Sequence, residues 1–479
     1  MRWGPPSRRS LAAQLARRGK EDTGRLELVD GSRIAVIGGG PAGSLFSYFV
    51  FKMAEVVGLE LTIDIFEPRT FKRCGPAGCN HCGGIVSESL VQLLATEGIN
   101  LPPRVVQRGL DSYLLHMDVG SVRIDTPLHE QRIAAVFRGN GPRDARHIDW
   151  DSFDDFLLRL AVGRGAKIVR RVVTGIDCSN EKPVPTHAGE RGEPYDLVAV
   201  AAGINSNLLR TIEAEPCGYE RPTSVATYLC EFQLDRETIQ RYLGSSMHVF
   251  LLDLPRLEFA ALVPKGNVVT MCLLGHEIDM DLVRAFLDSA EVRACFPPGA
   301  DLPAKVCNCS PLINVRGPAR PYSDRLVFIG DSGVTRLYKD GIGAAYRTAK
   351  AAASTVVFQG VSKAAFERHY RRTCRRISRD NAIGKFIFAF NGQIQRRRFS
   401  RRAILRMVSE EQASPGAKRY LSRVLWDLFT GSAPYREVLL NTMRPGFIRG
   451  ILRHTARSIL PFEDRPMLEG KFHGRDRTG

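Results

Sequence analysis

The chain has 479 residues, 44% of them hydrophobic and 25% charged, which excludes a disordered or fibrous protein and allows two or three domains. Its formal net charge is +17, and residues 361–460, with 22 basic and 6 acidic side chains, account for nearly all of it. Lys52, Glu55 and Glu60 interrupt the longest apolar stretch, which excludes a transmembrane helix, and eleven scattered cysteines argue against a secreted disulfide scaffold.

The chain begins with an Arg-rich segment, residues 1–31, that lacks the apolar middle of a secretory signal. We predict a disordered basic tail there and a cytoplasmic protein. Residues 33–37 then form a short apolar run that is typical of a buried parallel strand. A helix is expected over 44–57 and a second strand over 59–66, which completes a βαβ unit.

The turn inside this unit reads Gly38-Gly39-Gly40-Pro41-Ala42-Gly43. In this pattern the first glycine permits a tight turn, the second lets a diphosphate approach the backbone, and the third lets helix and strand pack closely. The N-terminus of the helix attracts the diphosphate. Glu67 ends the second strand, 24 positions after Gly43, where it would accept hydrogen bonds from a ribose. The turn therefore predicts a dinucleotide site, without separating NAD from FAD.

Further strands follow along the chain. Residues 167–173, 196–202 and 325–329 are expected to join the same parallel sheet, while 105–137 and 223–275 hold short strands that we assign to one antiparallel sheet built from two insertions. The predicted fold class is α/β, with a Rossmann-like nucleotide domain interleaved with an antiparallel substrate domain and followed by a helical region. The predicted segments are 32–104, 146–215 and 321–360 for the nucleotide domain, 105–145 and 216–320 for the substrate domain, 361–460 for the basic helices and 461–479 for a tail.

A second glycine-bearing motif lies near the end of the last strand. Gly330-Asp331 follows that strand, and Gly341-Ile342-Gly343 opens a small-residue helix over 343–357. This stretch resembles the second FAD motif of flavoprotein reductases and hydroxylases. The resemblance implies that Asp331 accepts hydrogen bonds from ribityl hydroxyls and that the helix directs its N–H groups at the flavin. We therefore expect FAD, with NAD(P)H as a possible electron donor.

With both motifs, residues 33–360 resemble the geranylgeranyl reductase-like flavoproteins, which are related to the p-hydroxybenzoate hydroxylase fold. The segment from Cys82-Gly83 to Ser87 and the block Asp196 to Ala202-Gly203 are similar to segments of that family. The resemblance implies that Cys82, Gly83, Ala202 and Gly203 contact the cofactor. The Trp-rich motif of flavin halogenases is absent from the sequence, since tryptophan occurs only at positions 3, 150 and 426.

Cys82 belongs to a group of four soft ligands, Cys74, Cys79, His81 and Cys82, within nine residues. Following the resemblance, Cys82 would lie beside the flavin and act as a catalytic proton donor. Alternatively, Cys74 and Cys79 form a redox dithiol, Cys74, Cys79 and Cys82 bind an iron–sulfur cluster, or the cluster with His81 binds zinc. These alternatives stay open in the sequence.

The basic region carries apolar residues at helical spacing. One stripe, 404–408, follows the arginine run 396–402, and another lies at 447–452. Such helices would lie on an anionic membrane surface and make the protein peripheral to it, or simply pack on the protein. The charge does not predict a nucleic-acid partner, because no recognised binding module accompanies it.

The two motifs thus predict an FAD-dependent oxidoreductase, and the family resemblance implies that it reduces C=C bonds of a hydrophobic, isoprenoid-type substrate, such as a membrane lipid, by hydride transfer. The alternatives are a flavin-dependent monooxygenase and an electron-relay protein that uses Cys74, Cys79 and Cys82.

Overall fold

A computed structural model describes residues 26–459, apart from 76–77, 80, 128–129, 144–149, 188, 216, 299–304 and 415–417. The predicted tail 461–479 and residues 1–25 of the predicted N-terminal tail lie outside the described residues. Residues 26–31 pack on the body. The Leu28 side chain is buried, and the Val361 N–H donates to the Leu26 carbonyl at 2.7 Å. The packed chain thus begins before residue 32.

A six-stranded sheet forms the first layer. Its strands lie in the order β20 (Tyr322–Ser323), β21 (Leu326–Phe328), β12 (Leu197–Val200), β1 (Arg33–Ile37), β2 (Thr62–Phe66) and β8 (Lys167–Val169). All neighbours pair in parallel except β20 with β21. The central strands are buried and apolar, as expected for a sheet covered on both faces. The five predicted parallel strands therefore share one sheet. The strand predicted over 167–173 ends at Val169, because β9 (Val173–Asp177) belongs to a small antiparallel sheet instead.

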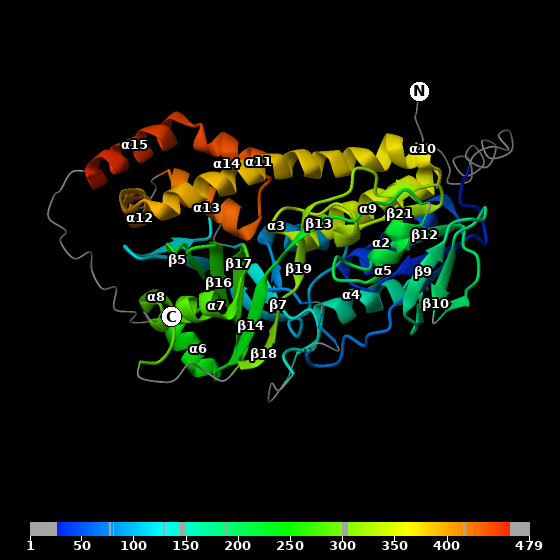
Figure 1. Ribbon diagram of the computed structural model, residues 1–479, viewed down its shortest axis with the longest axis horizontal. Coiled ribbons are helices and arrows are strands. Elements are labelled where there is room, and N and C mark those ends of the chain that lie inside the picture. The colour runs from blue at the N-terminus through cyan, green and yellow to red at the C-terminus, as the bar shows by residue number, and fades with distance from the viewer. Residues whose placement is uncertain are drawn as a thin grey trace, which may run out of the picture.

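Two long helices cover one face of this sheet. They are α2 (Pro41–Val57) and α9 (Gly341–Phe358), which share one hydrophobic core. Small residues such as Ala345, Ala349 and Ala352 on α9 allow the close approach. Helix α4 (Phe153–Val162) packs beside α2. Figure 1 shows these helices against the parallel sheet in the right half of the molecule.

A second sheet of seven strands forms the other half. Its order is β18 (Lys305–Cys309), β14 (Tyr228–Gln233), β17 (Val268–Gly275), β16 (Leu257–Lys265), β15 (Ser246–Phe250), β5 (Ser112–Met117) and β6 (Gly120–Asp125). The two insertions meet at β5 and β15, which pair in parallel, so the sheet is mixed and not purely antiparallel. The interleaved α/β arrangement predicted from the sequence is confirmed.

Some strands of the two insertions lie outside this sheet. Strands β4 (Val106–Leu110) and β7 (Ile133–Val136) form a separate sheet with β3 (Ile85–Val86), and β13 (Thr223–Ala226) pairs with β19 (Leu312–Arg316). The prediction of one sheet for all of 105–137 and 223–275 was therefore wrong. β7 takes β3 and β4 as partners, and the β4–β7 pair contains a register shift between Val106 and Arg108.

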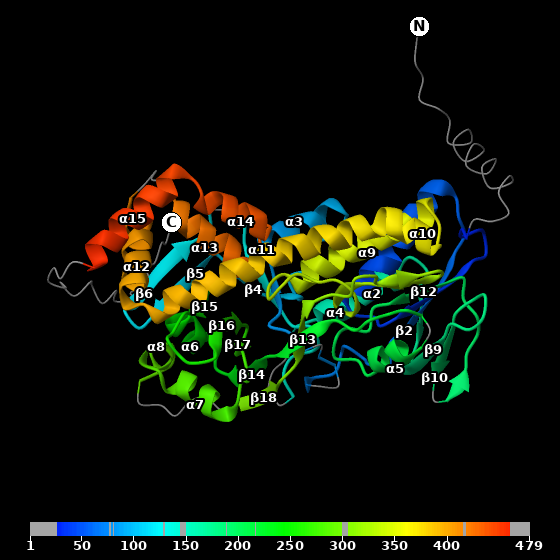
Figure 2. The same ribbon diagram turned by 45° about the horizontal axis from the view of Figure 1, so that its top comes forward.

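The C-terminal helices form a layer over both halves. They are α10 (Lys363–Ala365), α11 (Arg371–Arg396), α12 (Arg398–Ala413), α13 (Tyr420–Thr430), α14 (Tyr435–Thr442) and α15 (Pro445–Ile459), with a π-helical turn at Phe366–Tyr370. Figures 1 and 2 show α11 running along the length of the molecule. Its Cys374 and Ile377 lie in the core of the parallel sheet, and its Phe388 lies in the core of the seven-stranded sheet.

The apolar stripe Ile404, Leu405, Met407 and Val408 is buried in that second core. This stripe packs on the protein and is not available to a membrane. In the described part of the chain, no helix is both long enough and apolar enough to cross a bilayer.

Candidate functional site

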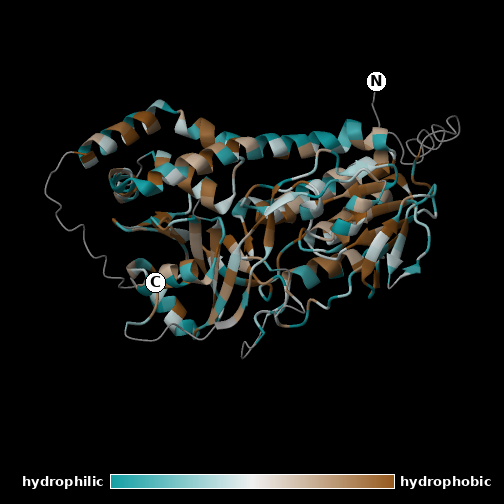
Figure 3. Cartoon of the chain, in the orientation of Figure 1, coloured by the Kyte–Doolittle hydropathy of each residue, from teal (hydrophilic) through white to brown (hydrophobic). Residues whose placement is uncertain are grey.

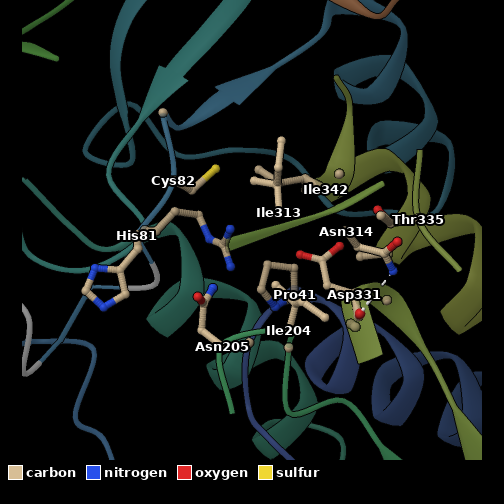
Figure 4. Close-up of a pocket in the computed structure, with 18 of the residues that line it drawn as sticks. Pro41, His81, Cys82, Ile204, Asn205, Ile313, Asn314, Asp331, Thr335 and Ile342 are labelled. Atoms are coloured by element: carbon tan, nitrogen blue, oxygen red, sulfur yellow. Dashed lines mark hydrogen bonds between the residues drawn. The ribbon is translucent and has the colours of Figure 1, made fainter. Parts of the chain in front are cut away.

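A cavity of about 550 Å³ opens between the carboxyl ends of the parallel strands and the seven-stranded sheet. Ligands of open α/β sheets bind at this edge. The segments that follow β1, β2, β12 and β21 all reach the cavity wall. Predicted cofactor residues on the wall are Gly38, Gly40, Pro41, Ala42, Glu67, Cys82, Gly83, Ala202, Gly203, Gly330, Asp331, Gly341 and Ile342. Figure 4 shows Pro41, Cys82, Asp331 and Ile342, from four parts of the chain, around one space.

Gly43 and Gly343 lie behind the wall and not on it. A Cβ atom on Gly43 would lie 1.9 Å from the Gly38 carbonyl oxygen, and one on Gly343 would lie 2.1 Å from Oδ1 of Asp340. Both contacts are far shorter than any real Cβ contact. Glycine at position 43 therefore keeps α2 close to the turn that precedes it, and glycine at position 343 leaves room for the Asp340 carboxylate.

The two glycine motifs meet in space. Gly330 has a φ of 61°, and a Cβ atom there would lie 2.7 Å from Cβ of Ala42. Gly203, which follows β12, donates its N–H to Oγ of Ser332 at 2.9 Å and so fixes a third turn beside them. The ends of β1, β12 and β21 thus form one continuous surface, although they lie far apart in the sequence.

Both helices that start at this surface lack a side-chain cap. Helix α2 begins after Gly40 and α9 begins after Asp340, and no side chain accepts from the first N–H groups of either helix. Neither helix has an acidic residue in its first turn. Unsatisfied N–H groups at a helix start favour an anionic or oxygen-rich ligand. The surface therefore presents the free N–H groups of two helix N-termini, those of α2 and α9, to one ligand.

Two carboxylates border the same surface. Glu67 is buried, and its oxygens accept from the Gly39 N–H at 3.0 Å and the Arg69 N–H at 3.0 Å. Asp331 is partly exposed on the cavity wall, and burial raises the pKa of its carboxyl group although Thr335 and Arg138 oppose the shift. Asn314, also on the wall, donates to the Asp331 carbonyl at 3.3 Å and so holds the backbone there. These carboxylates can accept hydrogen bonds from hydroxyl groups of a ligand.

Cys82 lies across the cavity from Asp331 (Figure 4). Its Sγ accepts from the Gly84 N–H at 3.4 Å. Arg138, on the same wall, donates to Asp154 from Nε and from Nη2, the latter at 3.0 Å. Burial lowers the pKa of the Arg138 guanidinium, but the charge of Asp154 and the side-chain hydrogen bonds to Asp154 and Cys82 raise it by more. The Arg138 guanidinium is therefore held beside Cys82, the cysteine that was predicted to contact the cofactor.

The other cysteines of the cluster lie away from the cavity wall. Cys74 contacts the Asn140 carbonyl at 3.1 Å, and Cys79 accepts from the His81 N–H at 3.2 Å. Burial raises the pKa of the Cys79 thiol to about 11. Among the described residues, the only three His, Cys, Asp or Glu side chains whose ligand atoms converge are His116, His248 and Cys295, in the seven-stranded sheet domain. The geometry thus offers no metal site at Cys74, Cys79 and Cys82.

The C-terminal layer contributes to the cavity, which the sequence did not suggest. Phe429 and Thr430, at the end of α13, line the wall. Arg336 and Lys339, on the loop between the two halves of the second motif, line it as well. Burial lowers the pKa of Lys339 to about 7. Only the position of Lys339 two residues before Gly341 could have drawn attention to it.

No protein-family model and no curated protein sequence matches this chain. Solved structures do. The flavoprotein/dehydrogenase from Cytophaga hutchinsonii superposes with a TM-score of 0.56 at 15% identity, over 90% of this chain and 98% of that one. The flavin-dependent halogenase CmlS superposes with a TM-score of 0.54 at 17% identity, over 88% and 72%. The p-nitrophenol 4-monooxygenase PnpA from Pseudomonas putida DLL-E4 gives 0.51 at 14%, over 87% and 98%.

The chain has the fold of these flavoproteins. The p-hydroxybenzoate hydroxylase-type fold expected from the two motifs is therefore confirmed. The resemblance to geranylgeranyl reductases in particular stays a prediction, because the three neighbours named above are a flavoprotein/dehydrogenase, a halogenase and a monooxygenase.

Proposed function

We propose that the protein is an FAD-dependent oxidoreductase. The contact between Gly330 and Ala42 carries this proposal, because it joins the two motifs into a single surface for one extended dinucleotide. The uncapped starts of α2 and α9 would hold the diphosphate and the flavin, and Glu67 and Asp331 would accept from the ribose and ribityl hydroxyls. When bound, FAD supplies two-electron transfer between a donor such as NAD(P)H and the substrate.

The absorption spectrum of the purified protein and FAD titration of any flavin-free fraction test this proposal. We expect about one FAD per chain, and weaker binding in Asp331→Ala. The matched control is Asp324→Ala, since Asp324 caps the Lys363 N–H on the surface, outside the cavity. A protein that stays colourless after incubation with FAD contradicts the proposal.

The favoured reaction is reduction of a C=C bond in a hydrophobic substrate. Such a reduction adds one hydride equivalent, which NAD(P)H provides, and one proton. Cys82 is the proton donor that we propose, because its thiol lies on the wall beside Arg138. We expect the protein to turn over a geranylgeranyl lipid without oxygen. We expect Cys82→Ala to lose this turnover while its FAD content stays unchanged. Unchanged turnover in Cys82→Ala removes the thiol from the chemistry.

The second candidate is a flavin-dependent monooxygenase, which the shared fold with p-nitrophenol 4-monooxygenase PnpA favours. The two reactions differ in their need for oxygen. A reductase consumes NAD(P)H and substrate under argon, whereas a monooxygenase requires one O2 per product. Halogenation is less favoured, because the Trp-rich motif of flavin halogenases is absent from this sequence.

We also propose that the C-terminal layer binds an anionic membrane, through other residues than the buried stripe. Large apolar side chains are exposed on three adjacent helices, as follows: Phe386 and Phe390 on α11, Leu440 on α14, and Ile448 and Leu452 on α15. Figure 3 shows hydrophobic and hydrophilic residues alternating along α11 and α15. Exposed arginines at 449, 453 and 457 accompany them. This combination is typical of helices that lie in a membrane interface.

Flotation with vesicles tests this surface. We expect binding to vesicles that contain phosphatidylserine, weaker binding at high salt, and little binding to phosphatidylcholine vesicles. Phe386→Ser with Leu452→Ser should reduce the bound fraction, whereas Val56→Ser with Val172→Ser, which removes exposed apolar groups elsewhere, should not. Equal binding by both double variants contradicts the assignment of this face.

A further inference from the structure

Part of the cavity wall is strongly apolar. The seven-stranded sheet and the end of α13 form this part of the wall. Its side chains are Met247, Phe259, Ala261, Val263, Leu274 and Phe429. They come from β15, β16, β17 and α13. A hydrophobic group of a substrate can be buried there.

One ammonium group lies at this apolar wall. Nζ of Lys339 is 3.7 Å from the ring centroid of Phe259 and 5.9 Å from that of Phe429. The lysine lines the cavity and no carboxylate partner is found for it in the described part of the chain. The neighbouring Asp340 pairs instead with Arg336 at 3.5 Å and with Arg347 at 2.7 Å.

The other cations of the wall differ from Lys339 in this respect. Arg69 pairs with Glu67 at 3.2 Å, Arg138 pairs with Asp154, and Arg336 pairs with Asp340. Each of them already has a carboxylate partner, although Arg336 shares Asp340 with Arg347. Contact with an aromatic ring compensates an ammonium only in part, so Lys339 keeps the capacity to bind an anion.

The loop that carries Lys339 is held rigidly. Asn381 of α11 accepts from the Leu337 N–H at 2.9 Å and donates to the Thr335 carbonyl at 2.8 Å. The Arg336 guanidinium donates to the Gly431 carbonyl at 2.5 Å. Tyr338 and Asp340, on either side of Lys339, have φ values of 59° and 57°. Non-glycine residues adopt such angles where the surroundings impose them, often at functional sites.

We propose that Lys339 binds the carboxylate of an otherwise hydrophobic substrate, whose apolar part lies against Phe259 and Phe429. This inference rests on the proposed function, since it assigns the substrate class of the same cavity. A carboxylate beside an ammonium in a poorly hydrated cavity is attracted far more strongly than in water. A neutral hydrocarbon chain would leave the Lys339 charge without a partner.

The protonation of Lys339 agrees with this role. Burial lowers its pKa to about 7. The Cys272 thiol itself stays neutral near pH 7, because burial raises its pKa to about 12. A bound carboxylate would favour the charged form of Lys339 and so complete the pair.

The test compares acids with alcohols of the same shape. The flavin-loaded protein is titrated by calorimetry at pH 6.5 with octanoate and octan-1-ol, and with 3-phenylpropanoate and 3-phenylpropan-1-ol. We expect each acid to bind about tenfold or more tightly than its alcohol. Lys339→Met should abolish this preference and Lys339→Arg should keep most of it. Lys350 lies in α9 and pairs with Glu97 outside the cavity, so Lys350→Met should keep all of the preference.

Equal affinities for acid and alcohol in the native protein overturn the inference, as does an unchanged preference in Lys339→Met or the absence of binding by both acids. FAD content and reduction by NAD(P)H are measured on the same samples. A protein that holds FAD, accepts electrons and shows no preference for acids loses only the Lys339 assignment. A protein that binds no flavin loses the proposed function, whatever the acids do.

Discussion

Gly43 lies behind the cavity wall, where α2 begins beside β1. A methyl group there would displace either the helix or the Gly38 carbonyl, because the two atoms would be 1.9 Å apart. We predict that Gly43→Ala destabilises the protein by about 1–3 kcal/mol and lowers its FAD content. Gly392→Ala is the control, since a Cβ on Gly392 in α11 meets no atom within 4 Å and should stabilise the helix slightly. Urea unfolding and flavin absorbance measure both effects; equal losses in the two variants contradict the prediction.

Lys339 gives a prediction of pH dependence. Its pKa of about 7 lies below the ordinary value of 10.5, so the group that binds an anion is present below pH 7 and is lost above it. Acid affinity should therefore fall about tenfold per pH unit above 7 and level off below. Affinity for the matched alcohol should stay flat, and Lys339→Arg should remove the fall. An acid affinity that is constant from pH 6 to 9 contradicts this role.

Some residues of the candidate site could be predicted from the sequence, and others could not. Gly38 and Gly43 follow from their spacing, because the turn they form is local, and Asp331 follows from the resemblance to the second FAD motif. Lys339 depends on Phe259 and Phe429, which come from distant segments, and no local pattern marks such a contact. The Arg138–Asp154 pair is hidden from the sequence for the same reason.

The loop between Thr335 and Asp340 shows how one element depends on another. Asn381 of α11 makes two hydrogen bonds to this loop, and Tyr435 of α14 donates a third to the Leu337 carbonyl. The sequence placed the loop in the second FAD motif but gave no sign of what holds it. The strands of the parallel sheet were predictable from apolar runs, whereas the pairing of β5 with β15 was not, because pairing partners leave no local signal.

Asn381→Ala should therefore weaken the loop and, with it, ligand binding. The change leaves the Leu337 N–H and the Thr335 carbonyl without their partner, which costs about 2 kcal/mol or more. Asn391→Ala, at a buried site on the same helix where the amide nitrogen has no partner among the described residues, should cost less than about 1 kcal/mol. Denaturant unfolding gives both values. A larger loss in Asn391→Ala contradicts the proposed support.

Across the whole molecule, the helical layer and the two sheets share their cores. Trp426 of α13 is fully buried, stacks on Tyr113 of β5 at a centroid distance of 5.5 Å, and donates from its indole N–H to Glu88 at 2.8 Å. Glu88 belongs to α3 (Glu88–Thr96), in the segment that follows the first nucleotide motif. The basic C-terminal region is therefore part of the folded body and not an appended module.

We predict that Trp426→Ala lowers the free energy of unfolding by about 3–5 kcal/mol. Because the layer is integrated, loss of helical circular dichroism and release of the flavin should shift together to lower denaturant concentration. Phe358→Ala, which removes an exposed aromatic group, serves as the control with little effect. Flavin release at an unchanged midpoint in Trp426→Ala contradicts the integration of the layer.

Helix α11 has one end in the core of the parallel sheet and the other in the core of the seven-stranded sheet. Its 26 residues give a helix roughly 39 Å long that fixes the spacing between the two halves. A hinge motion that moved the two sheets apart would have to break or bend this helix. We therefore expect ligands to enter through movement of short surface loops, while the two halves keep their relative orientation throughout a catalytic cycle.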